Sequence, residues 1–246
     1  KMVAWLSSKK SEMQTLPIKL LSTKILEADI ILDAKASDID IECIPFIQIT
    51  TLQDTDLNEK LISISNKKIR AIFTSSNAVK ALQELLPKPP EWSYSTLEGR
   101  TLKSAASYFG PQKNTVTGHD GLSLAKGLVN EGDRVEKFFF CGNKRLDVLP
   151  DYLKEHGVQL EEVIVYKNEK IKKSITEKYS GILFFSPSAV KSFYSENPNE
   201  VGTLLFAFGE STKKALQAYS RNEIILNDEP NQAAFLEKIK KYFKHE

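Results

Sequence analysis

One short pattern occurs twice in the sequence, and it constrains the fold more than any other feature. The segment AIFTSSNAVKAL covers residues 71–82, and ILFFSPSAVKSF covers residues 182–193. Ser75 in the first copy aligns with Ser186 in the second, an offset of 111 (186 − 75). Each copy starts with an apolar run of strand length and passes through a serine-containing turn into apolar residues at helical spacing. Each copy therefore predicts a strand, a turn and a helix, which is half of a βαβ unit.

A second pair of segments repeats in the same order. LEGRTLKSAAS at 97–107 aligns with AFGESTKKALQ at 207–217, and the offset between Gly99 and Gly209 is 110 (209 − 99). A single short match can arise by convergence, because strand–turn–helix segments are common. Two matches in one order and at nearly one offset favour an internally duplicated α/β architecture.

The rest of the sequence continues the alternation of strands and helices. Further candidate strands lie at 18–22, 93–97, 115–117, 137–141, 203–208 and 223–226. Helical patterns follow most of them, which predicts parallel sheets with helices on both faces. We expect an α/β protein of two similar flavodoxin-like or Rossmann-like lobes that face each other across a cleft.

Two long, β-branched segments interrupt this alternation. They are IDIECIPFIQITTL (39–52), with no helix directly after it, and VQLEEVIVYKNE (158–169). We interpret them as paired connectors that form a two-stranded ladder. The predicted organisation is a first lobe from 1–38 and 168–246, a connector from 39–52 and 158–167, and an inserted second lobe from 53–157.

Composition limits the classes of function. The 246 residues suit one or two domains, and a formal net charge of +2 is too small to indicate nucleic acid but compatible with an anionic small ligand. Cys43 and Cys141 lack metal-ligand spacing and suggest reduced thiols in a cytoplasmic protein. No apolar run approaches the ~20 residues that span a bilayer, and no secretory signal opens the chain. The first residues, up to Pro17, predict no element.

The familiar catalytic motifs are absent from the sequence. It contains no G-x-G-x-x-G, no G-x-x-x-x-G-K-[ST], no H-E-x-x-H and no G-x-S-x-G. The three histidines, His119, His156 and His245, are scattered, so we expect no metal site. Polar turns at predicted helix starts recur instead, and they contain Thr74, Ser75, Ser76, Asn77, Thr101, Ser186, Ser188, Ala189, Ser211 and Thr212.

Helix starts of this kind can bind anions. Free N–H groups and the helix dipole favour an anion by about 0.3–1 kcal/mol at each helix start. In parallel sheets these turns gather at the carboxyl ends of the strands, where ligands bind. The pattern predicts a ligand with many carboxylates or phosphates. The simpler interpretation of each serine is an N-cap, of Tyr166 a connector residue, and of CGNKRLDVLP (141–150) an ordinary turn with solvated Lys144 and Arg145.

Taken together, these motifs resemble the uroporphyrinogen-III synthase family. The resemblance rests on FTSSNAV in one lobe, FSPSAV and GEST in the other, and a strand ending in Tyr166 between them. It extends from about Ile18 to the end of the chain, and Lys24 takes the place of the basic residue that usually follows the first strand in the family. The segment before Pro17 has no counterpart, and the helix near 25–37 is short.

The resemblance implies a lyase of heme biosynthesis that acts as a monomer without a cofactor. Its substrate would be hydroxymethylbilane, a linear tetrapyrrole with many carboxylates. The enzyme removes the terminal hydroxyl, inverts the last pyrrole ring and closes the macrocycle. Tyr166 is the candidate hydroxyl donor, and the other candidates, which bind substrate, are the helix-start residues above together with Lys24, Gly142 and Asn143. Two alternatives stay open: a non-enzymatic two-lobed binder of a polyanionic metabolite, and a nucleotide-dependent α/β enzyme.

Overall fold

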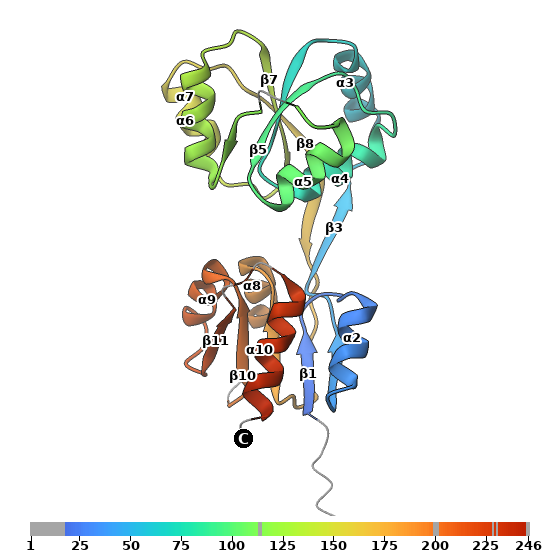
Figure 1. The fold of residues 1–246 in the computed structure, drawn as a ribbon, viewed down its shortest axis with the longest axis vertical. Helices are drawn as coiled ribbons and strands as arrows, with labels where there is room; N and C mark the ends of the chain where they lie inside the picture. Colours follow the sequence, from blue (N-terminus) through green and yellow to red (C-terminus); the bar gives the residue numbers. More distant parts are fainter. Residues whose placement is uncertain (1–17, 113–114, 199–201, 228, 230, 245–246) are drawn as a thin grey trace, which may run out of the picture. The chain divides into compact units, whose positions relative to one another are not determined.

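The computed structural model describes residues 18–112, 115–198, 202–227, 229 and 231–244, so the segment before Pro17 and His245 lie outside the described residues. The chain divides into two compact units. Unit 1 is Lys1–Ile47 with Lys170–Glu246, and unit 2 is Gln48–Glu169. In Figure 1 unit 1 therefore carries the colours of both chain ends, and unit 2 carries the colours between them.

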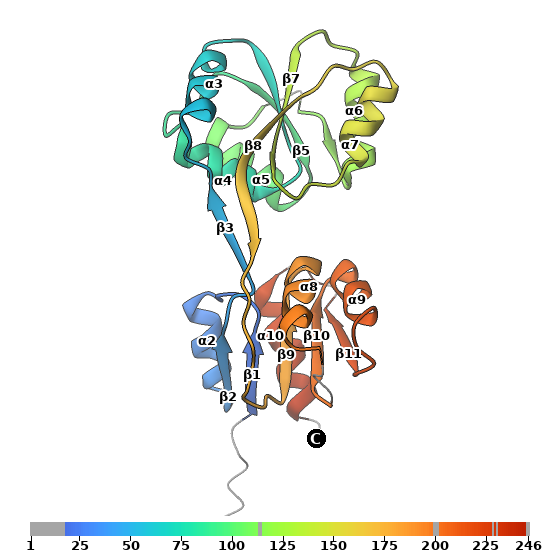
Figure 2. The same ribbon diagram turned by 180° about the vertical axis from the view of Figure 1, so that it is seen from behind.

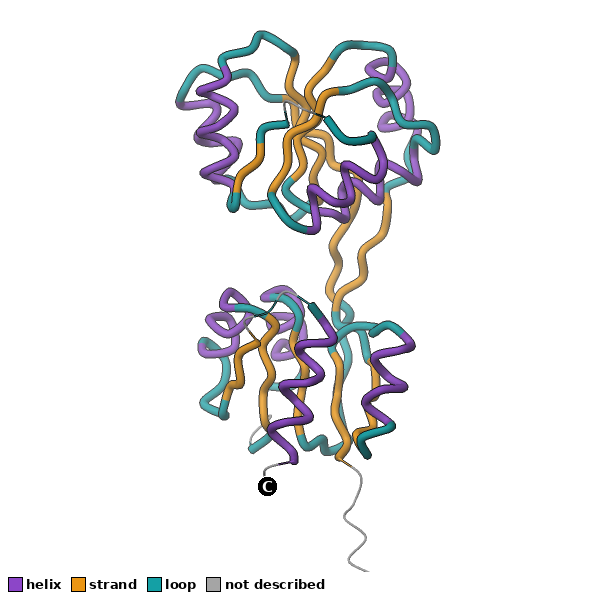
Figure 3. Tube along the Cα trace, in the orientation of Figure 1, coloured by secondary structure: helices purple, strands orange, loops and turns teal. Residues whose placement is uncertain are grey.

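Unit 1 is built on a parallel sheet in the order β11-β10-β9-β1-β2. Helices cover both faces of this sheet (Figure 3): α2 and α10 pack on one face, and α8 and α9 on the other. The strands are β1 (Ile18–Ser22), β2 (Ile39–Cys43), β9 (Gly181–Phe184), β10 (Leu204–Phe208) and β11 (Ile224–Asn227). The helices are α2 (Ala28–Lys35), α8 (Pro187–Glu196), α9 (Glu210–Gln217) and α10 (Gln232–Lys244).

Unit 2 is built on a sheet in the order β3-β8-β7-β4-β5-β6. Helices α3, α4 and α5 pack on one face, and α6 and α7 on the other. The strands are β3 (Ile47–Thr51), β4 (Ile69–Phe73), β5 (Ser93–Leu97), β6 (Thr117–Gly118), β7 (Glu136–Gly142) and β8 (Glu161–Lys170). The helices are α3 (Thr55–Ser65), α4 (Ser76–Leu85), α5 (Arg100–Phe109), α6 (Gly121–Glu131) and α7 (Val148–Glu155).

The continuous apolar runs of the sequence form the central strands. Every residue of β4 and every residue of β9 is buried. Strands of a parallel sheet lie between two layers of helices, so both of their faces need apolar side chains. This is why the two copies of the repeated segment begin with unbroken apolar runs and not with alternating ones.

The duplication seen in the sequence is also present in the topology. The order β8-β7-β4-β5-β6 in unit 2 corresponds to β2-β1-β9-β10-β11 in unit 1. The repeated segments lie at equivalent places, because β4 and α4 hold the first copy and β9 and α8 the second. Unit 2 follows β2 in the chain and precedes β9. The insertion of one unit into the other therefore explains why the same motif recurs so far along the sequence.

The predicted connector was wrong over part of its length. Ile39–Cys43 does not pair with the second segment but forms β2, which pairs with β1 in regular parallel register. Only β3 pairs with β8, and the two strands run in opposite directions (Figure 2). The burial pattern gives the reason: β2 buries Ile39 and Ile41 against α2 and α10, so its alternation marks the edge of a sheet.

Candidate functional site

The chain reverses its direction across the sheet of unit 2 between β4 and β7. From β4 it proceeds to β5 and β6 on one side, and it then returns to β7 and β8 on the other side. In open α/β sheets ligands bind at the carboxyl ends of the strands, at the point where the strand order reverses. The topology alone therefore selects the carboxyl ends of β4 and β7 as the first place to look for a site.

A cavity of about 380 Å³ lies at this point. Thr74 and Ser75, which follow β4, line it together with Gly142 at the end of β7 and Tyr166 on β8. The remaining lining residues include Leu97, Asp120, Cys141, Lys144, Arg145 and Leu149. The cavity lies within unit 2 and joins residues from five segments of that unit.

The mouth of this cavity carries exposed apolar side chains. Leu146 is 81% exposed, Val148 48% and Leu122 37%, and all three line the cavity. Large apolar side chains grouped at the edge of a hollow are typical of a ligand-binding surface. The cavity therefore suits a ligand with an apolar ring.

Two cationic side chains lie beside these apolar groups, and their environments differ. Arg145 donates from Nη2 to Glu162 at 2.7 Å and also contacts Asp147, and the hydrogen bond with Glu162 raises the pKa of Arg145 above its ordinary value. Lys144 is exposed and forms no ion pair with any carboxylate of the described residues. Lys144 is therefore the cation available to an anionic ligand.

The buried thiol of Cys141 is not a nucleophile. Burial raises the pKa of this thiol to about 11, and the charge of Glu162 contributes in the same direction. Since the thiolate is the reactive form of cysteine, Cys141 stays neutral at ordinary pH and serves as an apolar wall.

The start of α4 contributes a main-chain donor to the same region. The Ser75 hydroxyl is the N-cap and accepts a hydrogen bond from the Asn77 N–H at 3.2 Å. The Ala78 N–H donates to the Ser75 carbonyl oxygen at 3.2 Å, so the Ser76 N–H is the first-turn donor that remains for a ligand. The four residues 74–77 predicted from the sequence thus lie together at the carboxyl end of β4.

Gly142, Asn143 and Tyr166 also lie together. The Asn143 N–H donates to the Tyr166 carbonyl oxygen at 3.1 Å. Tyr166 is 8% exposed, and within the described part of the chain its hydroxyl forms no hydrogen bond. The predicted hydroxyl donor is therefore packed against the end of β7, with its hydroxyl group open to a new partner.

Thr101 lies apart from this group. It belongs to the first turn of α5, is 7% exposed and does not line the cavity. The N-cap of α5 is Gly99, with φ of 72°, a left-handed conformation that glycine adopts at little cost.

In unit 1 the equivalent reversal point lies between β1 and β9. Lys24 follows β1, and Ser186 follows β9 and caps α8 by accepting from the Ala189 N–H at 3.2 Å. Ser188 belongs to the first turn of the same helix. The predicted residues of unit 1 thus occupy the same topological place in their sheet as Ser75 does in unit 2.

An aromatic ring occupies this place in unit 1. Phe185 is equivalent to Thr74 at the offset of 111 (185 − 74), and its ring centroid lies 5.5 Å from those of Phe208 and Phe235. The Lys24 amine lies 4.4 Å from the centre of the Phe185 ring, close enough for a cation–π contact. The two units have therefore diverged at their reversal points. Unit 2 has a cavity there, and unit 1 has the Phe185 ring with the Lys24 amine beside it.

The turn at Gly209 has a structural role for one of its two predicted residues. Thr212 is 1% exposed, and its hydroxyl donates to the Phe208 carbonyl oxygen at 3.3 Å. Ser211 is exposed in the first turn of α9. Of the two predicted side chains, only Ser211 faces solvent.

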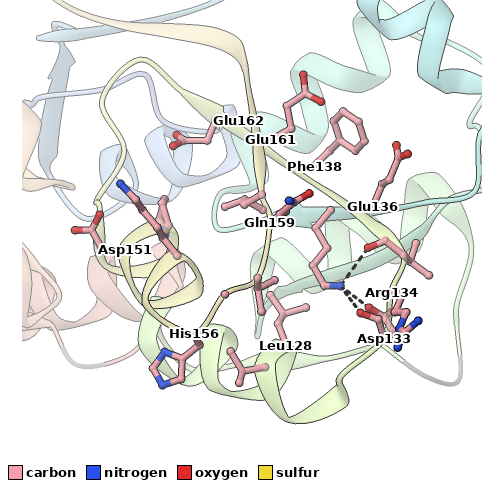
Figure 4. Close-up of a pocket in the computed structure, with 18 of the residues that line it drawn as sticks. Leu128, Asp133, Arg134, Glu136, Phe138, Asp151, His156, Gln159, Glu161 and Glu162 are labelled. Atoms are coloured by element: carbon pink, nitrogen blue, oxygen red, sulfur yellow. Dashed lines mark hydrogen bonds and ion pairs between the residues drawn. The ribbon is translucent and has the colours of Figure 1, made fainter.

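A larger depression, of about 1200 Å³, lies at the amino ends of β7 and β8. Figure 4 shows carboxylates of Glu136, Glu161 and Glu162 around it. The depression also borders the last turns of α6 and α7, where the helix dipole is negative. Basic residues line the depression as well (Arg134, Lys137, Arg145 and Lys154), so its charges are mixed and do not select an anion.

Two further classes of site have no counterpart among the described residues. No group of three or more His, Cys, Asp or Glu side chains is arranged to hold a metal ion within the described part of the chain. In the same residues, no helix combines the length and the apolar character needed to cross a membrane.

The apolar side chains at the mouth of the cavity, here called the rim, and Lys144 were not among the residues predicted from the sequence. A signal was present, because Lys24 lies four residues before α2 (28 − 24) and Lys144 four residues before α7 (148 − 144). These helices follow equivalent strands, so the duplication relates the two lysines. Leu146 and Val148 had no such signal, since they follow from the path of the loop.

Comparisons with known proteins agree with this geometry. The family model described as uroporphyrinogen-III synthase HemD matches residues 31–237. No curated protein matches the sequence. A mutant uroporphyrinogen III synthase from the thermophilic bacterium Thermus thermophilus superposes with a TM-score of 0.68 at 13% identity, covering 93% of this chain and 100% of that one. The uroporphyrinogen-III synthetase from Helicobacter pylori gives 0.64 at 16% identity, covering 92% and 99%.

The structural matches establish a shared fold along nearly all of the chain. The family match covers both repeated segments, β7, β8 and Tyr166. The chain belongs to the uroporphyrinogen-III synthase family.

Proposed function

We propose that this chain is a lyase that converts hydroxymethylbilane to uroporphyrinogen III, with Tyr166 as the donor to the departing hydroxyl. The observation that carries this proposal is the cavity at the reversal point of unit 2, where apolar side chains, a cation and a helix start surround Tyr166. A pyrrole ring is flat and apolar, and in this substrate it bears carboxylate side chains. The cavity offers a complementary surface to each part.

The carboxylates are bound by helix starts and by Lys144. The start of α4 supplies the Ser76 N–H beside the cavity, and the helix dipole favours an anion there. Unit 1 carries a second group of helix starts, at α8 and α9, together with Lys24, and we assign it the same role toward carboxylates. One chain supplies both groups, so the proposal requires only a monomer.

The reaction itself needs little from the protein. Electrons from the pyrrole nitrogen expel the terminal hydroxyl, and a proton donated to that oxygen lets it leave as water. The larger task is to hold the flexible bilane so that the inverted ring closes, and such orientation can supply about 7–11 kcal/mol of a reaction barrier. Tyr166 can supply the proton, since its hydroxyl makes no hydrogen bond to the described residues. We place the enzyme in the cytoplasm, which the free thiols of Cys43 and Cys141 support.

The product isomer tests the proposal. The purified protein is incubated with freshly made hydroxymethylbilane, and the cyclic products are oxidised and separated. We expect the isomer with the inverted terminal ring, formed at a rate proportional to protein concentration. A protein that only binds the bilane would give the same products as a sample without protein, and that result would overturn the proposal.

A further inference from the structure

The pairing of β7 with β8 shifts by one residue beside the cavity. Cys141 pairs with Ile164, but the next residue of β7, Gly142, pairs with Tyr166. β8 therefore contains one extra residue, Val165, at this point. Such irregularities are rare in parallel pairs, and beside active sites they change the direction of a side chain.

The equivalent strands of unit 1 pair without a shift. β1 and β2 correspond to β7 and β8, and their pairing runs in one register from Ile18 with Ile39 to Ser22 with Cys43. The fold therefore does not require the irregularity. It belongs to the unit that holds the cavity.

Gly142 lets the ring of Tyr166 come close to the main chain. A Cβ atom at Gly142 would lie 2.4 Å from Cζ, 2.5 Å from Cε2 and 2.9 Å from the hydroxyl oxygen of Tyr166. Its φ lies outside the left-handed region, so its main-chain conformation does not call for glycine. Glycine is needed here because the ring of Tyr166 approaches so closely. This approach places the hydroxyl end of the ring over Gly142, which lines the cavity.

Asn143 binds the main chain of β8 at two points, at Tyr166 and just after it. Its N–H donates to the Tyr166 carbonyl oxygen at 3.1 Å, and its Oδ1 accepts from the Asn168 N–H at 2.8 Å. These two hydrogen bonds bind the main chain at Tyr166 and two residues beyond it. The main chain that carries the ring is therefore held beside Gly142.

We propose that Gly142 and Asn143 are positioning residues that act through Tyr166. Together with the register shift they form a seat, defined as Gly142, Asn143 and Asn168, that fixes the Tyr166 hydroxyl at the cavity. This inference rests on the proposed function and deepens it, because it assigns the two residues to the orientation of the proton donor. Direct binding of substrate would be a different role for both.

The Asn143 side chain provides the first test. Asn143→Ala removes the acceptor for the Asn168 N–H but keeps the main-chain bond to Tyr166, so the fold is preserved. We expect kcat to fall about 10- to 100-fold with little change in KM, because a misplacement of about 1 Å can cost about 10²-fold. Asn143→Asp keeps an acceptor oxygen and is expected to restore most of kcat. A rise in KM at constant kcat would instead indicate direct binding and would overturn the inference.

A double-mutant cycle separates this inference from the proposed function. Residues that act through one another give non-additive effects, so in a Tyr166→Phe background Asn143→Ala is expected to change kcat less than about twofold. If Tyr166→Phe is slow and Asn143→Ala still lowers kcat by its full factor, the seat is wrong and the donor role stands. If Tyr166→Phe retains full kcat, the donor role is wrong, and the seat falls with it.

Gly142→Ala tests the close approach, with Gly181→Ala as its matched control. A Cβ at Gly181 would also meet an aromatic ring, 2.8 Å from Cε2 of Phe206, but in the sheet of unit 1. Both variants are expected to lower the melting temperature, and only Gly142→Ala to lower kcat at a temperature where both remain folded. Equal kcat values in the two folded variants would contradict the seat.

Discussion

Ser75 and Ser186 occupy equivalent N-cap positions in the two units. Each hydroxyl accepts a hydrogen bond from the first turn of its helix at 3.2 Å, from Asn77 N–H in α4 and from Ala189 N–H in α8. Both follow central strands next to the point where the strand order reverses. The motif that occurs twice in the sequence therefore has the same structural role twice, at the reversal point of each sheet.

Ser75→Ala and Ser186→Ala are each expected to lower the free energy of unfolding by about 1 kcal/mol, because the cap hydrogen bond is lost. Replacement by Gly is expected to cost only a few tenths of a kcal/mol, since Gly suits the N-cap conformation. Urea denaturation of the four variants measures this difference. Equal losses for Ala and Gly would show that the hydroxyls do not cap these helices.

Thr74→Phe is expected to abolish activity without loss of stability. Phe185 occupies the equivalent place in unit 1 and packs on Phe208 and Phe235, so a ring at residue 74 has a precedent in this chain. It would fill much of the cavity of about 380 Å³ and exclude a pyrrole ring. The rate of product formation and the melting temperature check this expectation.

Ile62→Phe is the control for that variant. Ile62 lies on α3 and is 66% exposed, so this variant adds an aromatic ring to unit 2 away from the cavity. Its activity should equal that of the unaltered protein. A fully active Thr74→Phe would mean that no part of the substrate enters the cavity.

Lys144→Gln is expected to raise KM about tenfold at unchanged kcat. The reason is the loss of a charged hydrogen bond to a substrate carboxylate, which contributes about 1.5–3 kcal/mol when formed. Lys144→Arg should keep a low KM, and added salt should raise the KM of the unaltered protein more than that of the Gln variant. Lys126→Gln, at an exposed position of α6 that does not line the cavity, should change neither constant. The assignment of Lys144 to substrate binding fails if both Gln variants behave alike.

The sequence predicted the two sheets well because the same strand–turn–helix pattern occurs in both units at nearly equal offsets. Apolar runs predicted the central strands of both units, the candidate strands at 18–22 and 93–97 coincide with β1 and β5, and the nearly equal offsets predicted the duplication. The prediction failed at β2, where alternation of buried and exposed residues is shared by sheet-edge strands and extended connectors. Only tertiary contacts with α2 and α10 distinguish the two.

The candidate site was predicted less completely. Ser75, Gly142 and Tyr166 all line the cavity. They could be predicted because strand ends and helix starts can be located in a sequence. The rim residues Leu146 and Val148 depend on the path of a loop, and the register shift at Gly142 depends on a pairing between distant strands. Neither leaves a local pattern. Thr212 stays a prediction, and its buried hydroxyl donates within its own turn.

Asp133→Asn is expected to lower the free energy of unfolding by about 3–5 kcal/mol, the usual cost of removing one partner from buried charges. Asp133 pairs with Arg70 at 2.8 Å and with Lys137, and both of these cationic residues are 6% exposed. In the variant Arg70 keeps Glu131 at 2.9 Å, but Lys137 loses its carboxylate partner among the described residues. Asp33→Asn is the control, because Asp33 is exposed and its partner Lys240 keeps Glu237 at 2.9 Å. The control should lose about 1 kcal/mol or less. Similar losses in both variants would contradict the structural role of the Asp133 cluster.

The same cluster predicts an acid dependence of stability. Burial raises the pKa of Asp133, but the hydrogen bond from Lys137 and the charge of Arg70 outweigh it and hold the pKa below the ordinary value. A carboxyl with a lowered pKa stabilises the fold above its unfolded pKa, about 3.9, and this contribution is lost as the pH falls through the lower, folded value. Below about pH 4 the stabilities of the unaltered protein and Asp133→Asn should therefore converge. A difference that stays constant as the pH falls to about 2 would contradict this sign.

Tyr166→Phe tests the proposed chemistry most directly, because it removes one oxygen atom and keeps the ring against Gly142. The measurement is the rate of formation of the inverted isomer by the unaltered protein and by the Phe and Ala variants, together with their melting temperatures. If the hydroxyl assists the loss of water, Phe lowers the rate about 10²–10⁴-fold at an unchanged melting temperature, and Ala lowers both. An unchanged rate in Phe would remove Tyr166 from the reaction and leave the orientation of the bilane as the whole of the catalysis.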